Sequence, residues 1–326
     1  MRSLKHIGLS ALVGLSFGSA VGGIALWPAA SAAAEPAQCQ TVRMSDPGWT
    51  DITSTTTTAS LILKAMGYKP TVQSLSVAIS IEGLRSGNLD VFLGNWMPAQ
   101  EQMTQKLIDA GSVNVLAVNL EGAALTLAVT GDAAKAGVKS FADLEKHGDK
   151  FTRTIFGIEP GSSANTKIKA MIDKNAYGLG SWKLVESSEA AMMASVDRAT
   201  RRNEWAVFLG WAPHPMNVKL AMDYLDGGED YFGANRGSAT VRTLSRGSFA
   251  KDCTNLATLF KQMIFTVGME NELMVAILND KMTPEAAVTS WLKAHPATLD
   301  PWLANVTTLA GKPALPVVKG ALGIGS

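Results

Sequence analysis

Three tryptophans stand in short segments where an apolar run or a glycine leads into a turn. Trp49 lies in SDPGWTD, Trp96 in VFLGNWMP and Trp211 in VFLGWAPHP. A ring held at such a place projects from a rigid scaffold into a cleft that can take a ligand. Facing indole rings bind a cation that holds little water, such as a trimethylammonium group. Core packing is the alternative for any single tryptophan, but the near copies VFLGNW and VFLGW favour a shared role.

The start of the chain has the layout of a secretory signal. Two basic residues precede an apolar run over about residues 7–27, and small residues follow it. We expect residues 1–34 to be a signal peptide, cleaved after Ala32 or Ala34. A membrane anchor is the alternative, which the many glycines and serines of the run disfavour. Since no later segment is long and apolar enough to span a bilayer, the sequence predicts an exported protein that is not embedded in a membrane.

Charge and motif content exclude several functions. Loss of Arg2 and Lys5 with the signal lowers the formal net charge from +1 to about −1, which favours neither nucleic acid nor an anionic membrane as a partner. The four histidines and two cysteines lack metal-ligand spacing, and no cofactor motif is found. The chain has no G-x-S-x-G or H-E-x-x-H motif. We assign Glu186 and Glu189 to countering a helix dipole, and therefore expect no enzyme.

Cys39 and Cys253 are the two cysteines of the chain. Disulfides persist in the compartments that exported proteins reach, so one long-range bridge is the simplest interpretation. It would stabilise the protein by roughly 4 to 5 kcal/mol at most. Two buried free thiols are the alternative.

Apolar runs alternate with amphipathic stretches along the chain, which is typical of an α/β protein. The first part is expected to alternate between strands and helices. The strands are predicted over 41–46, 71–77 and 89–96. A turn and then a helix that stops at Gly67 are predicted within 50–68, and a short helix that ends at Gly87 and Asn88 is predicted within 80–88. This order builds a parallel sheet, and ligands bind at the carboxyl ends of such strands. Trp49 and Trp96 fall at those ends.

A break at Gly122 is expected to start a second α/β set, in which Trp211 again ends a strand. We therefore predict two lobes, each a mostly parallel sheet flanked by helices, with a ligand cleft between them. The expected limits are a signal at 1–34, a discontinuous first lobe at 35–120 plus 216–315, a second lobe at 121–215, and a tail at 316–326.

From Cys39 to about residue 310 the chain resembles the periplasmic substrate-binding proteins of choline and glycine-betaine ABC importers, above all the choline-binding members. The resemblance rests on CQTVRMSDPGWTDI, LDVFLGNWMP, GIEPGSSAN, VESSEAAM, VFLGWAPHPMN and MENELM. It implies a type II-like two-lobed fold and a monomer in the periplasm. It also implies a small quaternary ammonium ligand, which the protein hands to an ABC permease.

In that family three tryptophans and a tyrosine surround the ammonium, while an aspartate and an asparagine meet the ligand hydroxyl. Four of these positions match this chain: Trp49, Trp96, Trp211 and Asp51. Two positions depart from the pattern. Leu125 in GAALTLA replaces the tyrosine, and Ser162 in IEPGS replaces the asparagine. Whether Tyr231 or Phe232 supplies a replacement ring is open.

These two departures leave the ligand open. Each cation–π contact contributes up to about 2 kcal/mol, so three rings supply roughly 6 of the 8 kcal/mol that a micromolar affinity requires. Leu125 makes room for a different headgroup or a longer tail, and Ser162 can donate to a hydroxyl or a carboxylate. Carnitine, glycine betaine and trimethylamine N-oxide are therefore alternatives to choline, and service to a chemoreceptor is an alternative to transport.

Asp51 favours choline among these ligands, because a carboxylate attracts an ammonium group and repels a ligand carboxylate. A role as the N-cap of the following helix is its structural alternative. We expect His214, between Pro213 and Pro215, to fix its own segment rather than to touch the ligand.

Overall fold

The computed structural model describes residues 35–325. The predicted signal peptide at 1–34 lies outside the described residues, so it stays a prediction. Within the described range, no helix has both the length and the apolar character that crossing a bilayer requires.

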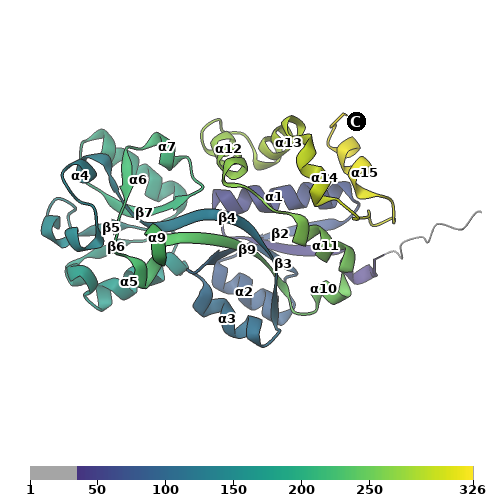
Figure 1. The fold of residues 1–326 in the computed structure, drawn as a ribbon, viewed down its shortest axis with the longest axis horizontal. Coiled ribbons are helices and arrows are strands. Elements are labelled where there is room, and N and C mark those ends of the chain that lie inside the picture. Colours follow the sequence, from purple (N-terminus) through teal and green to yellow (C-terminus); the bar gives the residue numbers. More distant parts are fainter. Residues whose placement is uncertain (1–34, 326) are drawn as a thin grey trace, which may run out of the picture. The chain divides into compact units, whose positions relative to one another are not determined.

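The described residues form one mixed sheet of nine strands. The strands are β1 Thr41–Asp46, β2 Lys69–Ser74, β3 Val91–Met97, β4 Val113–Thr130, β5 Thr154–Phe156, β6 Lys183–Val185, β7 Val207–Ala212, β8 Met222–Tyr224 and β9 Ser238–Arg246. Their order is β2-β1-β3-β9-β4-β7-β5-β6, and β8 pairs with β4 beside this path. Two parts of the sheet are parallel, namely β2-β1-β3 and β7-β5-β6. The antiparallel strands β9 and β4 run side by side between them (Figure 1).

Helices flank both parallel parts. The α-helices are α1 Thr50–Ala65, α2 Val77–Ser86, α3 Glu101–Asp109, α4 Gly131–Lys135, α5 Ser163–Asp173, α6 Glu189–Arg201, α7 Met216–Lys219, α8 Glu229–Phe232, α9 Ala234–Gly237, α10 Phe249–Asp252, α11 Thr254–Gln262, α12 Val267–Leu278, α13 Pro284–Ala294, α14 Leu299–Trp302 and α15 Ala314–Ala321. Short 3-10 helices cover Ala37–Cys39, Phe141–Asp143, Glu145–His147, Ala176–Ser181 and Pro296–Thr298. In Figure 1, α1, α12 and α13 lie on one side of β1–β3, while α2 and α3 lie on the other.

We call β1–β3 with α1–α3 and α11–α13 the first lobe, and β5–β7 with α4–α6 the second lobe. The α/β fold expected from the sequence is confirmed, and the two parallel parts belong to one continuous sheet. A cluster of buried apolar side chains runs through both lobes, including Met44, Phe92, Ile155 and Phe208. Strand ends that carry site residues are therefore held by packed cores.

The expected break at Gly122 is wrong. β4 continues through this residue as one strand of 18 residues, while Gly122 has φ 75° and the register with β9 shifts next to it. Because glycine has no Cβ, it adopts this conformation at little cost and bulges the strand without ending it. The predicted lobe border at 120/121 thus falls inside β4, and β8 after the border at 215/216 pairs with β4 at Ala128–Thr130. Both limits stay predictions.

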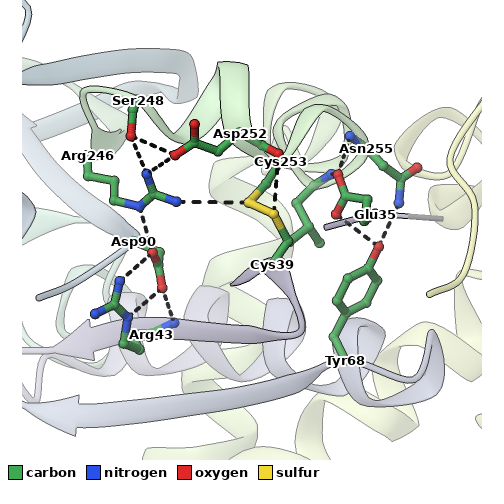
Figure 2. The surroundings of a disulfide bond; sticks show 11 residues. Glu35, Cys39, Arg43, Tyr68, Asp90, Arg246, Ser248, Asp252, Cys253 and Asn255 are labelled. Carbon is green, nitrogen blue, oxygen red and sulfur yellow. Dashed lines mark hydrogen bonds and ion pairs between the residues drawn. A yellow bond between two sulfur atoms is a disulfide. The ribbon is translucent and has the colours of Figure 1, made fainter. Parts of the chain in front are cut away.

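The predicted disulfide is confirmed: Cys39 before β1 is bonded to Cys253 between α10 and α11 (Figure 2). Glu35 accepts a hydrogen bond from the backbone N–H of Asn255 at 2.7 Å, and Arg246 lies between the disulfide and Asp90, to which its Nε donates at 2.9 Å. These contacts hold the early segment of the chain against residues 246–255.

Candidate functional site

One pocket is lined by all six residues that the sequence nominated as ligand contacts: Trp49, Asp51, Trp96, Leu125, Ser162 and Trp211. Ile158, Ser163, Ala164 and Leu209 complete its wall. The pocket is a small, closely lined space with a cavity volume of about 30 Å³. The structure therefore brings the nominated side chains together, and their contact with a ligand stays a prediction.

The three tryptophans reach the pocket from three elements. Trp49 precedes the first residue of α1, in a turn from β1 where Gly48 has φ 87°. Trp96 is in β3 and Trp211 in β7, and both are buried. The indole N–H of Trp49 donates to Glu159 Oε2 at 2.9 Å, and that of Trp96 donates to Asp51 Oδ2 at 3.1 Å. Because these two polar ring edges are occupied by protein, the orientation of each ring is fixed.

Leu125 and Ser162 occupy the two positions that depart from the choline-binding pattern. Leu125 in β4 pairs directly with Trp211 in β7, so the two side chains are cross-strand neighbours. Ser162 is the N-cap of α5, and its Oγ accepts from the backbone N–H of Asn165 at 3.2 Å. The hydroxyl proton of Ser162 is left to donate. Neither Tyr231 nor Phe232 lines the pocket: Tyr231 packs near Tyr177, and Phe232 near Phe141.

Asp51 is only 1% exposed. Its proposed alternative role as N-cap is wrong, because the N-cap of α1 is Trp49 and Asp51 lies within the first turn. Oδ2 accepts from Trp96, whereas Oδ1 has no hydrogen-bond partner within residues 35–325. Burial, and next the negative charge of Glu189, raise the pKa of Asp51 to about 8. A buried carboxylate oxygen without a partner is costly, and a ligand cation or hydroxyl at this pocket would relieve that cost.

Two glutamates behind the pocket were not found as site residues from the sequence. Glu159 accepts from Trp49, and burial raises its pKa. Glu189, for which the sequence predicts only a role at the dipole of its own helix, accepts from Thr50 of α1 and contacts His214. A glutamate in the first turn of a helix is an ordinary pattern, so only the folded arrangement shows that Glu189 reaches the other lobe. Glu159 lies within the motif GIEPGSSAN, but nothing in that motif indicates that its carboxyl group accepts from Trp49.

The electrostatic surroundings of the pocket are acidic. Glu270 of α12 is buried, and burial together with the charge of Asp51 raises its pKa well above the usual value. No lysine or arginine is among the residues that line the pocket, and residues 35–325 contain no cluster of histidine, cysteine or carboxylate ligands for a metal ion. A bound cation would favour the ionised form of Asp51, so the arrangement suits a small cation with apolar flanks.

An α/β fold in which antiparallel strands join two parallel parts of one sheet, with a pocket lined by residues of both parts, is typical of the substrate-binding proteins of ABC importers. Residues 40–294 match the family model OpuAC, the substrate binding domain of the ABC-type glycine betaine transport system. The chain belongs to this family, as its sequence motifs predicted. It is therefore a substrate-binding component of a transport system rather than an enzyme, and family members work in the periplasm or outside the cell.

Similar proteins agree with this assignment. An ABC-transporter choline binding protein in complex with choline is 45% identical, with a TM-score of 0.87 over 89% of this chain and 100% of that one. Lactococcal OpuAC, in its closed form with glycine betaine, is 26% identical, with a TM-score of 0.72 over 80% of this chain and 98% of that one. The uncharacterized protein ORF1 of Chromohalobacter salexigens is 48% identical over 128 residues. This alignment covers 39% of this chain and 83% of ORF1.

Proposed function

We propose that this protein captures choline, or a closely related quaternary ammonium cation, in the tryptophan-lined pocket and delivers it to an ABC permease from the periplasm. One observation carries the proposal: three indole rings border the same small pocket as Oδ1 of Asp51, which is buried and has no hydrogen-bond partner among residues 35–325. The rings suit a trimethylammonium group. The free carboxylate oxygen suits either its charge or a hydroxyl proton of the ligand.

The acidic surroundings favour an alcohol over a ligand that carries a carboxylate. Asp51 lines the pocket, and Glu159 and Glu189 lie one contact behind it. The ionised form of Asp51 would repel a ligand carboxylate, and no lysine or arginine is among the described residues of the pocket wall to balance that repulsion. Choline, whose only charge is the ammonium, meets no such repulsion. The choline complex of the 45% identical protein supports the same choice.

Glycine betaine, carnitine and trimethylamine N-oxide are the alternatives. The proton of the Ser162 hydroxyl, which is 2% exposed and lines the pocket, favours an anionic group at that end. Leu125 beside Trp211 favours a bulkier or longer ligand than a tyrosine there would allow. The glycine betaine complex of lactococcal OpuAC supports this second possibility.

Capture requires the lobes to close around the ligand. Trp49, Asp51 and Trp96 come from first-lobe elements, Ser162 and Trp211 come from the second lobe, and β4 and β9 join the two. Closure about these strands would complete the ring cage and create the surface that the permease recognises. Binding of the same surface by a chemoreceptor is the alternative. Reconstitution with the permease distinguishes the two partners.

A titration of the purified mature protein tests the proposal. Choline, glycine betaine, carnitine and trimethylamine N-oxide are each added while intrinsic tryptophan fluorescence is recorded. We expect saturation by choline, with glycine betaine at least about tenfold weaker, which is about 1.4 kcal/mol. Tighter binding of a carboxylate ligand would reject the choice of choline, and silence for all four ligands would reject the pocket chemistry.

A further inference from the structure

We propose that Glu189 is a positioning residue for ligand binding, which bridges the two walls of the pocket and holds the ring-bearing segments at the spacing that the ligand needs. The inference rests on the proposed function, because its main readout is binding of a quaternary ammonium ligand. Glu189 itself does not line the pocket.

The carboxylate of Glu189 receives hydrogen bonds from both lobes. It is the first residue of α6 in the second lobe and is 5% exposed. Oε2 accepts from the backbone N–H of Thr50 at 2.8 Å, and Oε1 accepts from Thr50 Oγ1 at 2.8 Å. His214 Nε2 lies 3.1 Å from Oε1. Three polar groups thus converge on one buried carboxyl group, which fixes its position.

On the first-lobe side, Glu189 completes the start of α1. Thr50 is the first residue of that helix, and the helix has no side-chain cap of its own, because its N-cap is Trp49. The first N–H groups of a helix need an external acceptor, and a negative charge at this end also stabilises the helix dipole. Glu189 supplies both the acceptor and the negative charge, and it does so from the second lobe. Since Trp49 and Asp51 flank Thr50, the placement of both depends on this contact.

On the second-lobe side, Glu189 holds His214. The Nδ1 atom of His214 accepts from the backbone N–H of Met216 at 2.9 Å, so its proton is on Nε2, which donates to Glu189. The imidazole ring in turn packs edge-on against Trp211, with 4.7 Å between ring centroids. Glu189 therefore fixes the ring that supports Trp211. One carboxylate links Trp49 on one wall with Trp211 on the other.

The bridge exists only while the lobes are together, so it should set the lifetime of the loaded state rather than the rate of encounter. Glu189→Gln preserves shape but replaces one acceptor oxygen with a donor NH₂. In one orientation of the amide its NH₂ group faces the backbone N–H of Thr50, and in the other it faces the Nε2–H of His214. We expect the choline dissociation rate to rise about tenfold or more, with the association rate within about twofold of wild type.

Matched variants separate positioning from a loss of fold. Glu204→Gln makes the same change at an exposed residue of the second lobe and should leave both rates unchanged. Thr50→Val removes one donor and should raise the dissociation rate about threefold to tenfold, whereas Thr50→Ser keeps the hydroxyl and should restore the wild-type rate. In the double variant Glu189→Gln/Thr50→Val, the two effects should be less than additive.

The rates are measured by stopped-flow tryptophan fluorescence with choline, and thermal unfolding checks that each variant folds. Wild-type dissociation rates in both Glu189→Gln and Thr50→Val, or equal damage by Thr50→Ser and Thr50→Val, would overturn the proposal. Failure of the wild type to bind choline would instead refute the proposed function. In that case the ligand among glycine betaine, carnitine and trimethylamine N-oxide that does saturate the wild type takes the place of choline, and a wild-type dissociation rate of that ligand in Glu189→Gln would overturn the bridge.

Discussion

Replacement of Asp51 by asparagine tests the electrostatic part of the proposal. The change is nearly isosteric: the amide oxygen can keep the hydrogen bond from Trp96, and the NH₂ group takes the place of Oδ1, which has no partner in the described structure. The ring cage is therefore left intact, while the one carboxylate on the pocket wall loses its charge.

The magnitude follows from burial and from the pKa. Attraction between Asp51 and an ammonium nitrogen about 5 Å away is about 3 kcal/mol at an effective dielectric constant near 20. The pKa of Asp51 in the empty pocket is raised to about 8, so at pH 7 ionisation of the carboxyl costs about 1.4 kcal/mol of that attraction. Asp51→Asn should therefore weaken choline binding about 15-fold at pH 7 and about 100-fold or more at pH 9.

The pH profile follows from the same shift. Below about pH 8 the empty pocket holds Asp51 in its neutral form, because burial raised its pKa. A bound cation favours the ionised form and lowers that pKa, so binding releases a proton. Choline affinity should rise with pH up to about 8 and be level above it. Asp51→Asn should remove this slope.

Fluorescence titrations of choline from pH 6 to pH 9 measure both effects in the wild type and in Asp51→Asn. Asp132→Asn, a change at a half-exposed carboxylate of α4, serves as the control. Equal choline affinity in wild type and Asp51→Asn, or a wild-type affinity that falls as pH rises from 6 to 8, would refute the reasoning.

Three further outcomes are expected. Trp49→Ala and Trp211→Ala should each weaken choline binding about tenfold or more, since each removes one cation–π contact. If calorimetry gave both variants the choline affinity of the wild type, the rings would not contact the ligand. Leu125→Tyr should strengthen choline binding by adding a ring beside Trp211, and an unchanged dissociation constant would place residue 125 outside the cage. Cys39→Ser/Cys253→Ser should lower the free energy of unfolding by up to about 5 kcal/mol, because the bridge closes a loop with a sequence separation of 214; denaturant curves that superimpose on the wild type would contradict this.

Local patterns in the sequence predicted the parts of the fold that depend on neighbouring residues. The strand at 41–46, the helix that follows it and the stop at Gly67 agree with the structure, where Gly67 has φ 91° after the end of α1. Alternation of apolar and amphipathic runs, together with glycine at a helix end, is a local signal. Gly122 misled us because the same residue can end a strand or bulge it.

The tertiary parts of the site were beyond such patterns. The tryptophan segments and the family motifs predicted which residues line the pocket. They did not predict that the cap of α1 comes from Glu189, which is 139 residues away from Thr50. Nothing near Trp49 in the chain signals that its helix borrows a cap from another lobe. The pKa of Asp51 likewise depends on its burial and on the nearby charge of Glu189. Neither the burial nor this proximity can be predicted from local sequence patterns.

The central claim is that the three indole faces and Asp51 recognise positive charge. A comparison of choline with its neutral carbon isostere, in which a tert-butyl group replaces the trimethylammonium group, tests it by calorimetry on the wild-type protein. The two ligands have nearly the same shape and apolar surface, so burial alone would bind them equally. The account predicts that the neutral isostere binds at least about 100-fold more weakly. Equal affinity for both would contradict it.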